Sequence, residues 1–195
     1  MYRSAARNLL SRYVERPVAS VLARTGVHPN VITLLGLALA GGSAYLLSGG
    51  HLLAGALVLL ASGVADLLDG MVARWTKRET PFGAVLDSVA DRLGEAGVLL
   101  GLLVFYLTPP NVAGVILVYL ALAGSVMVSY LRARSEGLGI QYSGGLMTRP
   151  ERVLVLVVGL LINQVSIALG VIAVFAFLTV GQRLWYIRKH TAGAR

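Results

Sequence analysis

The sequence predicts an all-α integral membrane protein with six transmembrane helices, and three observations support this fold class. Of the 195 residues, 56% are hydrophobic and only 13% are charged, which is about half the charged share of an average soluble domain. The basic residues fall into clusters that alternate with uncharged turns. Between them lie apolar runs, several of which approach the roughly 20 residues that a membrane-spanning helix needs.

The positions of the basic residues predict the topology. They occur only in residues 3–24, 74–92, 132–152 and 183–195. The turns without any charged residue are 48–52, 108–112 and 162–166. Basic loops of membrane proteins face the cytoplasm, so both termini are expected on that side of a prokaryotic cell (plasma) membrane. This placement explains the net charge of +8 without a nucleic-acid partner.

The elements follow in order along a single domain, 1–195, with no internal repeat or linker. Residues 1–25 place apolar side chains among five arginines, which favours an amphipathic juxtamembrane helix lying on the membrane interface; a solvated basic tail is the alternative. The six expected spans are 30–48, 52–76, 82–107, 112–134, 150–163 and 166–187. The fifth is short, so five spans plus a partly buried helix is the other possibility. We expect Asn30 or Thr33 to cap the first span.

Four aspartates stand in this apolar sequence: Asp66, Asp69, Asp87 and Asp91. Spacings of three and four residues put each pair on one face of its own helix. A charged carboxylate inside a membrane costs at least ~2.5–3.5 kcal/mol, so these groups need compensation. An all-oxygen cage of this kind suits hard divalent cations such as Mg²⁺.

Salt bridges to nearby cations are the alternative explanation for the aspartates. The candidate cations are Arg74, Lys77, Arg78 and Arg92. Such bridges leave Gly70 and Gly83 unexplained, because glycine inside a helix costs ~1 kcal/mol relative to alanine. Two glycines beside the aspartates instead indicate close approach of a ligand or of another helix.

Together these residues form one continuous motif, Asp66-x2-Asp69-Gly70-x2-Ala73-Arg74-x8-Gly83-x3-Asp87-x3-Asp91. It resembles the full motif of the CDP-alcohol phosphotransferase family at every fixed position. The resemblance implies an enzyme of phospholipid biosynthesis that moves a phosphatidyl group from a CDP-linked lipid to an alcohol and releases CMP. It also implies a two-metal site for Mg²⁺, with Mn²⁺ possible, on the four aspartates, and Asp91 as the general base.

The same resemblance implies a site for the CDP-lipid on the cytoplasmic side. Gly70 would leave space for the nucleotide, and Arg74 would hold a phosphate oxygen as a charge-assisted donor. The complete expected set is Asn30, Val31, Ile32, Thr33, Asp69, Gly70, Ala73, Arg74, Thr80 and Gly83.

The acceptor is expected to carry a phosphate. Four arginines, at positions 132, 134, 149 and 152, flank the cytoplasmic face, and arginine suits bidentate phosphate recognition. The alternative is that these arginines only reflect the excess of basic residues in cytoplasmic loops and bind no substrate. The stretches SYLRARSEG and RPERVLVL resemble phosphatidylinositol-phosphate and archaetidylinositol-phosphate synthases, although a lysine often stands there at the position of Arg132. The expected acceptor set is Ser129, Arg132, Arg134, Arg149, Arg152 and Arg183.

The resemblance implies CDP-diacylglycerol and inositol phosphate as the substrates, and we expect a homodimer in the membrane. The main alternative is glycerol-3-phosphate as the acceptor, which arginines alone do not distinguish from inositol phosphate. An intramembrane prenyltransferase is a weaker alternative because its aspartate motifs are spaced differently. An ion transporter would place its carboxylates near the membrane midplane, whereas these lie toward the basic side.

Overall fold

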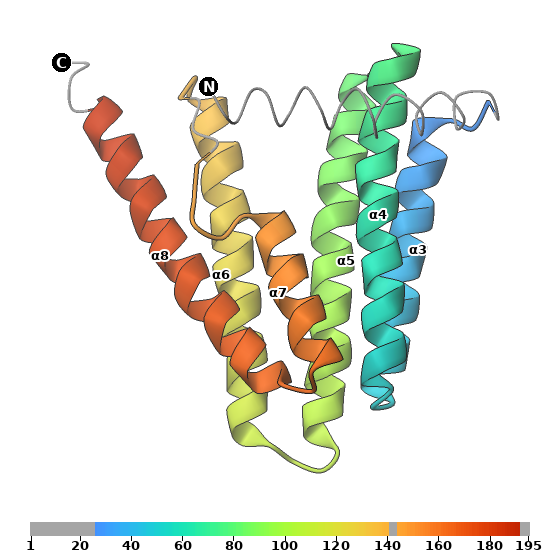
Figure 1. Ribbon diagram of the computed structural model, residues 1–195. Coiled ribbons are helices and arrows are strands. Elements are labelled where there is room, and N and C mark those ends of the chain that lie inside the picture. The colour runs from blue at the N-terminus through green and yellow to red at the C-terminus, as the bar shows by residue number, and fades with distance from the viewer. Residues whose placement is uncertain (1–25, 141–143, 192–195) are drawn as a thin grey trace, which may run out of the picture.

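The structure, a computed structural model, describes residues 26–140 and 144–191, which form helices only (Figure 1). These are α3 (Pro29–Ser48), α4 (Leu52–Thr76), α5 (Pro81–Leu107), α6 (Val112–Gly137), α7 (Arg149–Leu161) and α8 (Val165–Thr191). The all-α prediction is confirmed, and each helix begins within one residue of its expected start. The expected interfacial helix at 1–25 lies outside the described residues.

Four of these helices, α3, α4, α6 and α8, are long and apolar enough to cross a membrane. Helix α5 has 27 residues, but its first half carries Asp87 and Asp91, and Glu95 stands near its middle. Helix α7 has 13 residues, which at a rise of 1.5 Å per residue is shorter than the ~30 Å hydrocarbon core. The described residues therefore contain four candidate membrane spans, and the expected six-span topology stays a prediction.

The beginning of α3 differs from expectation. His28 caps it, because its Nδ1 accepts a hydrogen bond from the backbone N–H of Asn30 at 3.2 Å. Pro29 occupies the first helical position, where its missing N–H costs nothing. The prediction that Asn30 or Thr33 caps this helix is therefore wrong. Asn30 and Thr33 are both residues of α3 itself, so their side chains are available for contacts with the neighbouring helices.

Helices α3, α4 and α5 pack into one bundle, α6 packs against α8, and α7 contacts both α4 and α8 (Figure 1). Small residues and hydroxyls hold the bundle together, as is common between membrane helices. The Ser62 hydroxyl on α4 donates to the Gly36 carbonyl on α3 at 2.8 Å. A Cβ atom on Gly94 of α5 would lie 3.1 Å from the Cβ of Ala40. This packing brings the start of α3, the second half of α4 and the first half of α5 to the same end.

Candidate active site

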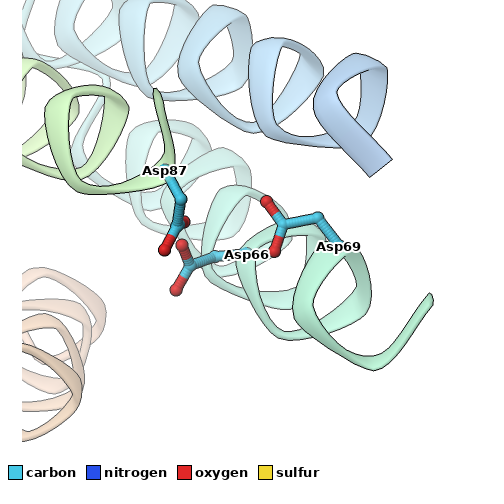
Figure 2. Close-up of side chains that lie close together, drawn as sticks. All are labelled: Asp66, Asp69 and Asp87. Carbon is cyan, nitrogen blue, oxygen red and sulfur yellow. The ribbon is translucent and has the colours of Figure 1, made fainter. Parts of the chain in front are cut away.

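Three of the four aspartates converge at this end of the bundle. Asp66 and Asp69 on α4 and Asp87 on α5 place carboxylate oxygens within 4.8 Å of one another (Figure 2). Mg²⁺ binds oxygen at about 2.1 Å, so ligands on opposite sides of one ion lie ~4.2 Å apart. Small side-chain rotations would therefore close these oxygens on a divalent ion.

Asp69 is the most buried member of this cluster, and Thr33 orients it. The Thr33 hydroxyl donates to Asp69 Oδ2 at 2.6 Å, and both residues are buried. A hydrogen bond of this kind holds a metal-ligating carboxylate in one orientation. Thr33, expected in the nucleotide pocket, thus lies directly behind a carboxylate of the cluster.

Asp91 lies beside this cluster and contacts a cation from α7. Arg149 Nη1 lies 2.6 Å from Asp66 Oδ2 and 2.7 Å from Asp91 Oδ1. The Nε of the same guanidinium is a buried donor without a hydrogen-bond partner among the described residues. Leaving a buried donor unsatisfied costs ~1–3 kcal/mol, so Arg149 retains hydrogen-bonding capacity for an anion such as a phosphate.

The aspartates are not neutralised by the protein alone. Within the described residues, the ion pairs of these four aspartates involve Arg149 and no other cation. Four carboxylates and one guanidinium leave a net charge of three negative units. No ion pair among the described residues joins these aspartates to Arg74, Lys77, Arg78 or Arg92, so the alternative of salt bridges to those cations finds no support here. The donor set, all carboxylate oxygen, fits hard divalent cations.

Next to the carboxylates, the starts of α3 and α5 meet. Thr80 caps α5 by accepting a hydrogen bond from the Gly83 N–H at 2.9 Å. A Cβ atom on Gly83 would lie 3.0 Å from Thr80 Oγ1 and 3.3 Å from Asn30 Oδ1. The structure thus brings together Asn30, Thr80 and Gly83, three members of the expected nucleotide pocket.

The rest of the expected nucleotide set divides between this surface and the core. The Arg74 side chain folds back along α4 and lies over Gly70. A Cβ atom added to Gly70 would lie 3.2 Å from Arg74 Nη1. Ala73 is half-buried on the same helix, and Val31 is exposed on α3. Ile32 packs in a buried cluster with Ala65 and Val72, which gives it a role in holding α3 against α4.

Replacing Gly83 with alanine is expected to weaken donor binding. The added methyl would sit closer to Thr80 and Asn30 than carbon atoms normally tolerate, so Asn30 must move. If CDP-diacylglycerol is the donor, as the motif's resemblance implies, its KM should rise about tenfold, equivalent to ~1.4 kcal/mol, with little change in the KM for the acceptor. The control is Gly97→Ala in the same helix, where a Cβ atom would meet nothing within 4 Å. An unchanged donor KM in Gly83→Ala would remove Gly83 from the pocket.

Of the expected acceptor residues, Arg149 is the one that reaches the aspartates. Arg152 is 2% exposed and bonded to Glu95 through Nε at 2.6 Å. Arg183 is also buried and donates to the Val128 carbonyl at 2.8 Å. Arg132 is exposed and paired with Glu136 on its own helix. Arg134 is exposed and Ser129 is half-buried. The acceptor role of each of these residues, Arg149 included, stays a prediction.

A cavity of about 300 Å³ opens below the carboxylates, between α3, α4, α5 and α7. Asp66, Asp91 and Arg149 line its charged end. Most of its other walls are apolar, and include Ala40, Leu59, Leu60, Leu154 and Val157. Its volume is at the lower end of the range of small-molecule sites. A charged end above an apolar body suits an amphiphile such as a lipid.

The family model of the CDP-alcohol phosphatidyltransferases matches residues 26–185. The chain belongs to the CDP-alcohol phosphatidyltransferase family. The match includes every aspartate of the candidate site and all helices except the end of α8. The resemblance seen in the motif is therefore confirmed over most of the chain.

Curated relatives within this phosphatidyltransferase family extend over nearly the same length. The phosphatidylinositol phosphate synthase of Mycolicibacterium smegmatis is 36% identical over 188 residues, covering 90% of this chain and 84% of the relative. The archaetidylinositol phosphate synthase of Methanothermobacter thermautotrophicus is 35% identical over 187 residues, covering 93% and 91% of the two chains.

Crystal structures of the phosphatidylinositol phosphate synthase of Mycobacterium tuberculosis have the same fold. The structure with CDP-DAG bound gives a TM-score of 0.80 at 32% identity and covers 90% of this chain and 94% of the other. The structure with manganese and citrate gives 0.80 at 33% identity, covering 89% and 88%. Together with the cluster of three aspartates, the manganese complex indicates a divalent metal site in this phosphatidyltransferase.

Glu95 is the residue that sequence reasoning left without a role. The signal was available, because an ionisable side chain inside an apolar span usually has a function and a partner. Glu95 stands four residues after Asp91 in α5, at the start of an apolar run. Its partner, Arg152, is 57 residues away in the chain, and only the placement of α7 between α4 and α8 reveals it.

Proposed function

We propose that this protein transfers a phosphatidyl group from CDP-diacylglycerol to a hydroxyl of inositol phosphate and releases CMP. The observation that carries this proposal is the carboxylate cluster, which lies beside Arg149 at the charged end of an apolar cavity. The names of the two curated synthases and the M. tuberculosis structure with CDP-DAG bound support the substrates.

Donor binding divides among three parts of the site. We assign the nucleotide to the surface formed by Asn30, Gly70, Arg74, Thr80 and Gly83, and part of the lipid to the apolar cavity. The four aspartates would hold Mg²⁺ or Mn²⁺ ions, which neutralise the diphosphate and stabilise the departing CMP oxygen when bound. Asp69, held by Thr33, is the ligand with the least freedom to move.

Asp91 is proposed as the general base of the reaction. It lies outside the cluster of three, at the charged end of the cavity. Asp91 would accept the proton of the acceptor hydroxyl as its oxygen bonds to the phosphatidyl phosphorus. The bond between that phosphorus and the CMP oxygen then breaks, and CMP leaves with the electron pair.

Arg149 is proposed to hold the acceptor phosphate, because its buried Nε lacks a partner among the described residues. Arg149→Ala removes a charge-assisted contact worth ~1.5–3 kcal/mol, so the KM for inositol phosphate should rise roughly ten- to a hundredfold. The KM for CDP-diacylglycerol should change less than about twofold, and Arg149→Lys should recover part of the loss. A parallel rise in both KM values would make Arg149 a general positive charge.

The acceptor itself is tested by competition. Purified protein receives CDP-diacylglycerol with equal concentrations of inositol phosphate and glycerol-3-phosphate, and the products are separated by mass. We expect phosphatidylinositol phosphate as the dominant product and little reaction with unphosphorylated inositol. A dominant phosphatidylglycerophosphate product would support the alternative acceptor, whereas no CMP release with any alcohol phosphate would reject the proposed reaction.

The membrane arrangement is proposed from the charge pattern and the family. Residues 1–195 would act as one domain in a prokaryotic plasma membrane, with the aspartates on the cytoplasmic side. Helices α5 and α7 would complete six spans around the site. Association into a homodimer is part of the proposal, and cross-linking in intact membranes tests it.

A further inference from the structure

Arg149 is held at the charged end of the cavity by two carboxylates from different helices. Its Nη1 lies 2.6 Å from Asp66 Oδ2 on α4 and 2.7 Å from Asp91 Oδ1 on α5. The side chains of Arg149, Asp66 and Asp91 are 25%, 28% and 23% exposed, so water screens these contacts less than it screens contacts at the surface. One nitrogen of the guanidinium thus bridges the two helices that carry the aspartates.

The main chain around Arg149 is anchored, so a change in its contacts requires only rotation of its side chain. Arg149 is the first residue of α7, which begins with a capping box in which Glu151 accepts a hydrogen bond from the Thr148 N–H at 2.9 Å. Just before it, the Met147 N–H donates to Thr179 Oγ1 on α8 at 3.0 Å. The arginine side chain itself is long and has many rotamers. The guanidinium is therefore the part of this segment that can move.

A divalent ion and Arg149 compete for the same two oxygens. Mg²⁺ binds carboxylate oxygen at about 2.1 Å, and Nη1 already lies within 2.7 Å of both Asp66 Oδ2 and Asp91 Oδ1. An ion on this pair of oxygens would lie in or beside the space of Nη1, and two positive charges that close repel strongly. Among the described residues, neither Asp69 nor Asp87 forms an ion pair with Arg149. The competition therefore concerns an ion that uses Asp91.

The two carboxylates also compete with a phosphate for the guanidinium. Bidentate recognition of a phosphate uses two N–H groups of one guanidinium at once. Nη1 of Arg149 is taken by Asp66 and Asp91, whereas its buried Nε has no hydrogen-bond partner among the described residues. A guanidinium released from the carboxylates would offer the donors of Nη1 as well, and its positive charge would no longer be neutralised by two anions.

We propose that Arg149 couples metal binding to acceptor binding: a cation that takes Asp66 and Asp91 displaces the guanidinium, which then becomes available to the acceptor phosphate. This inference rests on the proposed function, in which Arg149 holds that phosphate, and adds an order of binding to it. The acceptor binds tightly only after the metal ions are in place. Linkage requires the reverse effect as well, so the bound acceptor tightens metal binding by the same factor.

A binding experiment in chelator tests the release of Arg149 without any turnover. Asp66→Asn combined with Asp91→Asn removes both carboxylates that Arg149 contacts. Asp69→Asn combined with Asp87→Asn removes the same charge, also one carboxylate from each helix, and leaves those contacts in place.

Inositol phosphate, measured by equilibrium dialysis, should bind the first double variant at least about tenfold more tightly than the second. A general effect of charge would give the two variants the same affinity, because each has lost two negative charges from the same site. Equal affinities, or no binding to either variant, would overturn the release of Arg149 to a phosphate.

A metal-binding measurement separates this inference from the proposed function. Arg149→Gln should tighten the binding of the weaker Mn²⁺ ion, followed by electron paramagnetic resonance, about tenfold. The matched control is Arg92→Gln, which removes the same charge next to Asp91 in the sequence. The exposed Arg92 guanidinium donates to the Ser88 carbonyl and forms no ion pair with the described residues, so its loss should change Mn²⁺ affinity less than about threefold.

Equal tightening by Arg149→Gln and Arg92→Gln would show that Arg149 acts only as a general positive charge. That result would overturn the competition whether or not the parent transfers a phosphatidyl group. Failure of the proposed function has a different signature, which is the absence of CMP release with any alcohol phosphate.

Discussion

Asp87→Asn is expected to reduce CMP release by a factor of about a thousand or more. Asp87 is the carboxylate that α5 contributes to the three-residue cluster, and an amide there removes one negative ligand. A metal contributes several kcal/mol to stabilising the transition state, and ~4 kcal/mol corresponds to roughly a thousandfold in rate. Asp66→Asn should have a similar effect. The measurement is CMP release from CDP-diacylglycerol in the presence of Mg²⁺.

The control for this prediction is Glu79→Gln, which removes a carboxylate from the exposed turn between α4 and α5 and should keep the parent rate. The thermal midpoints of all variants show whether they are folded. CMP release that continues undiminished in the presence of a chelator, or in folded Asp87→Asn, would contradict a metal site at these aspartates.

Asp91→Asn is expected to remove catalysis while leaving the binding of the cytidine nucleotide nearly intact. Positioned general bases contribute roughly 10²–10⁴ in rate, and an amide cannot take the proton. Nucleotide binding should survive because Asp66, Asp69 and Asp87, which form the compact cluster, remain to hold a metal ion. The measurements are kcat and the affinity for CDP in the same preparation. Equal losses of affinity and rate would make Asp91 a binding residue rather than the base.

The spacing of the aspartates was sufficient to predict that α4 and α5 bring carboxylates together, although the compact cluster holds three of the four and Asp91 lies beside it. Each pair lies on one face of its helix, and a turn of only residues 77–80 separates α4 from α5, so local geometry brings Asp66 and Asp87 together. The starts of the helices were predictable for a similar reason, whereas α6, α7 and α8 end at Gly137, Leu161 and Thr191 instead of at the expected residues 134, 163 and 187. Helix boundaries are marked by uncharged turns, prolines and changes in hydrophobicity, and each of these signals can be recognised from a few adjacent residues in the sequence.

The partners of the arginines were not predictable in this way. Arg149 and Asp66 are 83 residues apart in the chain, and their contact depends on where α7 packs against α4. Charge pattern alone placed Arg149 and Arg152 together in one expected acceptor set. The structure distinguishes them, since Arg149 reaches the aspartates whereas Arg152 is bonded to Glu95. The cap of α3 depended on His28, a residue outside the usual capping types.

The most direct measurement of the central claim is a titration of the purified protein with Mn²⁺, followed by electron paramagnetic resonance. We expect two ions per chain, with signals broadened by coupling between them, because ions in two-metal sites lie ~3.5–4 Å apart. Asp87→Asn should lose the coupled signal while Glu79→Gln keeps it. A single uncoupled ion, or binding that Asp87→Asn leaves unchanged, would contradict a two-metal site at Asp66, Asp69, Asp87 and Asp91.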